Sequence, residues 1–190
     1  MKKILHLALG LFLGVSVLQA HSDAFKPKFV DTLVDPYLSI HQGFVTDDLE
    51  AAQAGADAFL KAMKHAPHEG EAHEEAMDLS KPAKAISGTK DIKTARTAFL
   101  DLSRQMTSLV EHVGTTSDTP LYTAFCPMAF DNKGGQWMQS DKTVSNPYYG
   151  SMMLRCGSIK KKIAGSEGHS DHSGHGKMPM KKDDHSGHSH

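Results

Sequence analysis

The chain has 190 residues, nearly equal numbers of basic and acidic side chains, and a net charge of −1 at pH 7. This balance argues against a nucleic-acid-binding protein, which would need a basic surface, so we expect no nucleic-acid partner. The length fits one domain with a modest core and an additional tail.

The N-terminal segment MKKILHLALGLFLGVSVLQA has the three parts of a secretory signal peptide. Lys2 and Lys3 make a basic start, residues 4–18 are apolar, and Ala20 is a small residue at which a signal peptidase can cut. We therefore predict cleavage after Ala20 and a periplasmic or otherwise exported protein. The apolar run is short for a membrane span, so we expect no stable span after cleavage; an uncleaved anchor is the alternative.

The first expected helix covers residues 29–44, where apolar side chains recur at intervals of three and four. Pro36 lies inside this pattern. A proline lacks the backbone N–H that a helix interior needs, so we expect it to kink or restart the helix. Asp35 would then cap the restart.

Two further helices are expected at residues 47–65 and 92–113. Asp47 and Glu50 form a plausible capping box for the first of them, and Gly114 ends the second. These segments predict a mainly α fold, a small bundle of three longer helices.

We expect residues 65–90 to form a long exposed connection between the last two helices, because prolines and glycines interrupt a polar segment. Three histidines, His65, His68 and His73, lie there among glutamates. They are either a weak divalent-metal site or part of a solvated acidic loop, and the loop is the favoured interpretation.

After Gly114 the chain changes character, with short apolar runs separated by proline, glycine and asparagine. We expect a short strand at residues 121–125 and a short helix at 147–154 within an irregular segment that closes the bundle. From Gly165 on, apolar residues almost vanish, which predicts a disordered tail. The expected organisation is a signal peptide at 1–20, a helical metal-handling domain at 21–163 and a tail at 164–190.

Two sulfur-rich clusters lie in the closing segment. Cys126 is followed by Pro127 and Met128, and Met153 precedes Cys156 by three residues. Thiolate and thioether together are the ligands that a soft ion such as Cu(I) prefers, so Cys126, Met128, Met153 and Cys156 are candidate metal ligands. The alternative is a disulfide, because two cysteines in an exported protein pair by default.

The stretch YTAFCPMAFDNKGGQWMQSDKTVSNPYYGSMMLRCG resembles a small bacterial domain without an assigned function. That domain occurs alone in exported proteins and as a C-terminal extension of periplasmic adaptor subunits of heavy-metal efflux pumps. The segments YLSIHQGFVTDDLEAAQAGADAF and DIKTARTAFLDLS are similar to its helices, so the likeness covers residues 25–159.

The resemblance implies a helical domain that handles metal, most often copper or silver, with the cysteine and methionine positions as ligands and no catalytic reaction. An adaptor or another subunit of an efflux pump is the implied partner. His41 is a weaker candidate for a nitrogen ligand, because a lone histidine on a helix is more often a hydrogen-bonded residue. Trp137 and Tyr148 are expected to shield the site from water.

The C-terminal tail spells DHSGH twice around a Met-Pro-Met. Imidazole suits Cu(II), Zn and Ni, and thioether suits Cu(I), so a flexible chain with these side chains can capture metal. The candidate ligands in the tail are His169, His172, His175, Met178, Met180, His185, His188 and His190.

Three functions remain open from sequence alone. In the first, the protein binds copper for buffering or for delivery to an efflux system. In the second, a Cys126–Cys156 disulfide is structural, and exposed aromatic residues contact a pump or adaptor: Trp137, Tyr148 and Tyr149. In the third, the cysteines carry out thiol redox chemistry, although the chain lacks a Cys-x-x-Cys motif.

Overall fold

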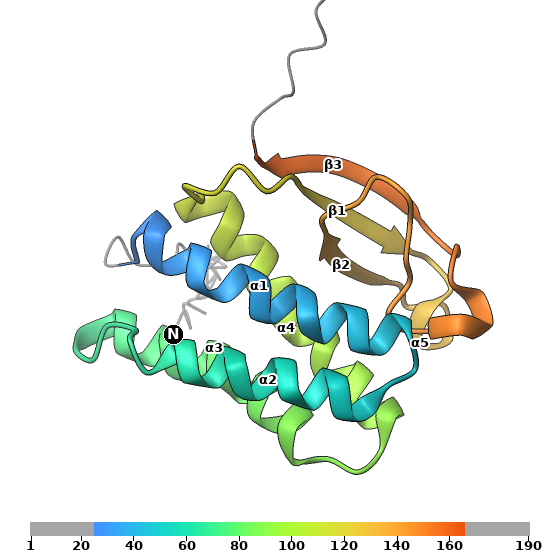
Figure 1. Cartoon of the computed structure of the whole chain (residues 1–190), viewed down its shortest axis with the longest axis horizontal. Coiled ribbons are helices and arrows are strands. Elements are labelled where there is room, and N and C mark those ends of the chain that lie inside the picture. The colour runs from blue at the N-terminus through green and yellow to red at the C-terminus, as the bar shows by residue number, and fades with distance from the viewer. Residues whose placement is uncertain (1–24, 166–190) are drawn as a thin grey trace, which may run out of the picture.

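The structure is a computed structural model that describes residues 25–165. The predicted signal peptide, its cleavage site and nearly all of the histidine-rich tail, including every proposed ligand there, lie outside the described residues. Within the described part, four long helices pack beside a small antiparallel sheet (Figure 1). None of these helices is long and apolar enough to cross a membrane.

The helical layer consists of α1 (Pro27–Val45), α2 (Leu49–Met63), α3 (Gly70–Gly88) and α4 (Ile92–Val113). Consecutive helices pack against one another, and α4 also contacts α1. The core runs through the whole bundle, with Tyr37, Phe59 and Phe99 among its fully buried side chains. Burial of these apolar faces is the main force that holds the helices together.

Helix α3 corrects the prediction of an exposed connection, so the bundle has four long helices rather than three. Five of its buried residues are spaced alternately four and three apart: Ala72, Ala76, Leu79, Ala83 and Ile86. Alanine contributes little hydrophobicity to such a stripe, and Pro82 lies inside the helix. The helical pattern was therefore present in the sequence, but proline and glycine masked it.

Helix α1 continues from Pro27 to Val45 through Pro36, so the predicted restart with Asp35 as its cap is wrong. Fully buried side chains on both sides of the proline, Leu33 and Ile40 among them, keep the two halves packed as one helix. Tertiary packing here outweighs the lost backbone hydrogen bond.

Helix α2 is capped by Asp48, whose carboxylate accepts a hydrogen bond of 2.9 Å from the Ala51 backbone N–H. The expected cap was Asp47, one residue earlier. Asp47 instead has a positive φ of 58° and directs its carboxylate toward other partners, described below. Helix α4 begins after its cap Asp91 and ends before Gly114, as its regular spacing predicted.

The sheet contains β1 (Leu121–Cys126), β2 (Gly135–Gln139) and β3 (Ser158–Ala164), in the order β2-β1-β3. The predicted strand at 121–125 is confirmed as β1, whereas β2 and β3 were not expected. Contacts with α1 and α4 place this sheet against the helical layer (Figure 1). The Tyr37 hydroxyl joins the two layers, since it accepts a hydrogen bond of 2.9 Å from the Met138 N–H and lies 2.8 Å from Ser103 Oγ.

A tight turn, α5 (Ala129–Asn132), reverses the chain between β1 and β2. Phe130, Asp131 and Asn132 have φ values of 54°, 57° and 63°, which is the left-handed region. Residues with side chains enter that region at a cost of about 1–2 kcal/mol each. The sheet and the packing of Phe130 against Tyr148, at a ring separation of 4.9 Å, hold the turn in place.

Candidate functional site

The two cysteines meet at one end of the sheet. Cys126 is the last residue of β1, and Cys156 comes two residues before β3. Because Phe125 pairs with Ser158 in the antiparallel ladder, the chain brings both thiols to the same place. Their sulfur atoms lie 2.7 Å apart although the residues are separated by 30 positions.

This separation allows two chemical outcomes after a small movement. A disulfide needs sulfur atoms about 2.05 Å apart. Two thiolates that bind one tetrahedral ion through bonds of about 2.3 Å lie roughly 3.8 Å apart. The pair can therefore close into a disulfide, or open by about 1 Å to admit a metal ion.

The two thiols differ in their surroundings. Cys126 is fully buried, whereas Cys156 is partly exposed, so a metal ion or an oxidant reaches the pair from the Cys156 side. The hydrogen bond with Cys126 and partial burial raise the pKa of Cys156 to about 11. At neutral pH this sulfur is a thiol, and a metal ion must displace its proton in order to bind.

Asn146 fixes the loop that leads to Cys156. Its side chain is fully buried, and its amide N–H donates a hydrogen bond of 2.8 Å to the Cys156 carbonyl. Its amide oxygen accepts hydrogen bonds from the backbone N–H groups of Tyr148 and Tyr149. Its backbone N–H donates to the Leu154 carbonyl at 2.8 Å, so one residue ties both ends of the loop together.

Tyr149 connects this loop to the segment that follows Cys126. Its hydroxyl donates a hydrogen bond of 2.7 Å to the Met128 carbonyl. Partial burial, followed by the nearby charges of Cys126 and Cys156, raises the pKa of Tyr149. The Tyr149 hydroxyl therefore holds the loop before Cys156 to the segment that follows Cys126.

The methionine candidates lie on the same two segments. Met128 is 46% exposed, and Met153 is half-buried with its carbonyl accepting a 2.9 Å hydrogen bond from the Cys156 N–H. Met152, beside it, is 80% exposed. Each cysteine thus has a methionine within three residues along the chain, and Met128 and Met152 are open to solvent.

His41 lies in a buried, hydrogen-bonded environment. It is buried on α1, and its Nε2 lies 2.9 Å from the Ser145 carbonyl, which only a protonated Nε2 can satisfy. Burial lowers the pKa of His41 to about 4, so the ring is neutral at physiological pH. Within residues 25–165, no three or more histidine, cysteine, aspartate and glutamate side chains are grouped to hold a metal.

The aromatic residues correct one expectation. Trp137 is fully buried and Tyr148 is 8% exposed, and their rings pack edge to face at 5.7 Å. The prediction that Trp137, Tyr148 and Tyr149 form an exposed interaction surface is therefore wrong for Trp137 and Tyr148. Both rings instead fill the space between the sheet and α4, where Tyr148 also lies near Phe99.

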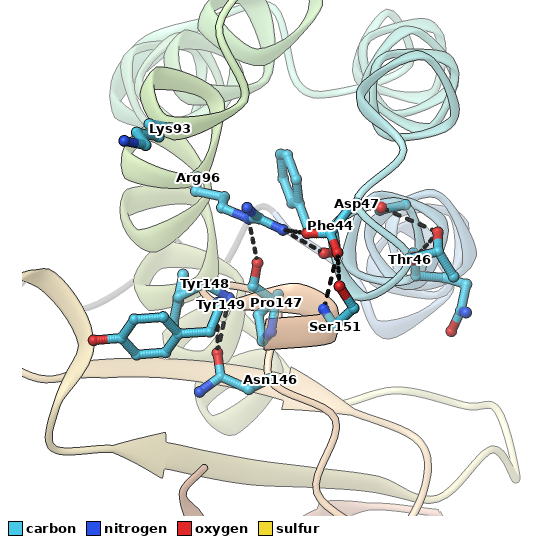
Figure 2. Close-up of polar contacts among 12 residues, drawn as sticks. Phe44, Thr46, Asp47, Lys93, Arg96, Asn146, Pro147, Tyr148, Tyr149 and Ser151 are labelled. Carbon is cyan, nitrogen blue, oxygen red and sulfur yellow. Dashed lines mark hydrogen bonds and ion pairs between the residues drawn. The ribbon is translucent and has the colours of Figure 1, made fainter. Parts of the chain in front are cut away.

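A polar cluster that the sequence did not reveal holds the outer side of the loop (Figure 2). We call it the Arg96 clamp, and it consists of Arg96, Asp47, Ser151 and the carbonyls of Phe44 and Pro147. The Ser151 hydroxyl and the Arg96 guanidinium hold the pKa of Asp47 down, at about 2. Helix α4, through Arg96, and the turn between α1 and α2, through Asp47, thereby hold the chain between Asn146 and Cys156.

Comparison with known proteins gives one match. Residues 33–118 match a family model described as a protein of unknown function (DUF3347). The match covers the four helices from Leu33 on and ends before β1, so neither cysteine lies within it. No curated protein and no solved structure matches the chain.

Proposed function

We propose that the protein is an exported heavy-metal-binding protein whose Cys126 and Cys156 thiols hold Cu(I), either for buffering or for delivery to an efflux system. The observation that carries the proposal is the approach of the two sulfur atoms to 2.7 Å from distant parts of the chain. Two thiols at one point form the core of a soft-metal site, because thiolates select soft ions over hard ones.

The donors fit Cu(I) as cargo. Cys126 provides a dry, buried ligand, and partly exposed Cys156 gives the ion a path in and out. Met128 and Met153 add thioethers on the adjoining segments, and thioethers belong to the soft ligands that select Cu(I) over hard ions such as Mg. The bound ion requires the sulfurs to move apart, which the loop before Cys156 can provide.

The histidines and methionines of the tail serve as a less selective capture site for Cu(II), Zn or Ni in this proposal. Export places the protein where an adaptor of a heavy-metal efflux pump can receive the metal. Support for this context comes from the export signal in the sequence and from the resemblance to domains attached to such adaptors.

A competitive Cu(I) titration of the reduced full-length protein against a chromophoric chelator tests the proposal. The tail is kept in every sample, so substitution of a single cysteine isolates the contribution of the thiol pair. Cys126→Ser and Cys156→Ser should each lose the tightest equivalent of Cu(I), with at least a tenfold fall in affinity. Serine variants that retain the wild-type isotherm would show that the thiol pair is not the copper site.

Methionine substitutions refine the ligand set. Met128 and Met77 are both 46% exposed, but Met77 lies on α3, away from the cysteine-bearing segments. Met128→Leu should weaken Cu(I) binding, whereas Met77→Leu should leave it unchanged. Equal effects of both substitutions would remove Met128 from the proposed ligands.

A second candidate function is a protein-interaction module with a permanent Cys126–Cys156 disulfide. The proximity of the two sulfur atoms and the full burial of Cys126 favour it, since a small movement brings the sulfurs to bonding distance in a protected site. Counting free thiols, before and after the folded protein is treated with a mild reductant, separates the two functions. A disulfide that the reductant does not open supports the structural role, and a disulfide that opens readily supports the metal site.

A further inference from the structure

We infer that Arg96 and Asp47 are positioning residues for the thiol pair: through the Arg96 clamp, the helical bundle sets how closely Cys156 approaches Cys126. The inference builds on the proposed thiol site but not on its metal, because it concerns the geometry of the two sulfurs. Neither residue contacts a sulfur, and both act through the loop that carries Cys156.

The guanidinium of Arg96 joins three segments (Figure 2). Its Nε donates a hydrogen bond of 2.8 Å to the Pro147 carbonyl, and its Nη2 donates one of 2.8 Å to the Phe44 carbonyl. Nη2 also forms an ion pair with Asp47. The Arg96 side chain is only 12% exposed, so its hydrogen bonds to the two carbonyls are shielded from solvent, whereas the Asp47 side chain is 37% exposed and the ion pair is partly screened.

Asp47 holds the same loop from the turn between α1 and α2. Its Oδ2 accepts hydrogen bonds from the backbone N–H of Ser151, at 2.9 Å, and from the Ser151 hydroxyl. Gly150 lies against the side chains of Asp47 and Arg96, and a Cβ atom at this position would come within 2.6 Å of Arg96 Nη2. Its φ of 56° is also in the left-handed region, so glycine is needed at this position on two grounds.

The clamp reaches Cys156 through a short path. Pro147 and Ser151 lie on the loop whose ends Asn146 ties together, with the Asn146 amide bonded to the Cys156 carbonyl. The loop is therefore fixed on its outer side by the clamp and on its inner side by Asn146. Releasing the clamp leaves β1 and Cys126 in place and lets the loop that carries Cys156 move, which separates the sulfurs.

The redox equilibrium of the thiol pair measures this positioning. In glutathione buffer, two protein thiols give up two electrons and two protons to one glutathione disulfide, yielding the protein disulfide and two glutathione thiols. The chain has no other cysteine, so the equilibrium constant reports on Cys126 and Cys156 alone. We expect Arg96→Lys and Asp47→Asn each to lower this constant in the folded protein by about five- to tenfold. Arg104→Lys is the matched control, because Arg104 lies on the same helix with a largely exposed partner, Asp101.

A purely structural role predicts a different result. Such a role would destabilise the oxidised and reduced proteins equally and leave the folded-state constant unchanged, so a constant within twofold of wild type overturns the inference. Ser151→Ala, which removes one clamp contact from the surface, replaces any variant that fails to fold. No copper is present in these measurements. A failed copper titration would therefore contradict the proposed function, whereas only the redox equilibrium tests the positioning role of Arg96 and Asp47.

Discussion

The side-chain amide of Asn146 donates a hydrogen bond of 2.8 Å to the backbone carbonyl of Cys156. This contact connects a fully buried polar side chain to the residue whose thiol meets Cys126. Buried polar groups are costly when left without partners, so the loop is strongly biased toward the conformation that satisfies Asn146. The geometry of the sulfur pair therefore depends on a residue that has no metal or redox chemistry of its own.

Asn146→Ala should lower the free energy of unfolding by about 2–4 kcal/mol, because it removes several buried hydrogen bonds and leaves the Cys156 carbonyl and the Tyr148 N–H without that partner. Urea denaturation of the reduced protein measures the change. Gln42→Ala is the control, since this amide is exposed on α1 and its loss should change stability by less than about 0.5 kcal/mol. A similar small effect at both positions would contradict the role assigned to Asn146.

Much of the helical fold could be predicted from sequence, because long amphipathic patterns determine both the start and the buried face of a helix. α4 matches its pattern at both ends. The same pattern did not predict α3, because its buried face is largely alanine and the helix contains Pro82. β3 has three consecutive lysines, so its sequence lacks the apolar alternation expected of a half-buried strand.

The site could be predicted only in part. The sequence identified Cys126 and Cys156, but their separation along the chain could not fix the sulfur distance. The contacts of Arg96 join residues 49 to 52 positions away, two of them through backbone carbonyls, and no local spacing encodes such contacts. For His41 the residue type suggested a metal ligand, but the sequence could not reveal that the side chain is buried and hydrogen-bonded to the Ser145 carbonyl.

His41 makes stability depend on pH. Burial lowers its pKa in the folded protein to about 4 from an ordinary value of 6.5. Between these pH values the unfolded chain binds a proton at this position and the folded protein does not, so stability falls as the pH decreases through this window. We expect a loss of about 2–3 kcal/mol from this group between pH 7 and pH 4.5.

Urea denaturation at both pH values measures this loss, and His41→Gln supplies the comparison because glutamine does not titrate. The variant should retain a shallower decline that comes from the remaining groups. An equally steep decline in the wild type and in His41→Gln would assign the acid sensitivity to other residues.

Two glycines should respond in opposite ways to alanine. A Cβ at Gly43 would lie 2.8 Å from the Ala52 Cα, where α1 and α2 cross with their backbones in contact. Gly43→Ala should therefore destabilise the protein by about 1–3 kcal/mol. At Gly88 the space around a Cβ is open, and Gly88→Ala should stabilise by about 0.4–1 kcal/mol by restricting the unfolded chain. Thermal and urea unfolding of the two variants check both signs, and destabilisation at both would contradict the packing argument.

Cu(I) affinity should rise steeply with pH if the thiol pair is the site. The pKa of Cys156 is raised to about 11, so near neutral pH this group is protonated, and binding must release at least one proton. The affinity should then increase at least about tenfold per pH unit between pH 6 and pH 8. Competition titrations at several pH values measure the slope, and Cys156→Ser, which retains the tail, corrects for binding by histidine and methionine. A slope near zero after this correction would mean that no thiol proton is displaced and that copper binds elsewhere on the chain.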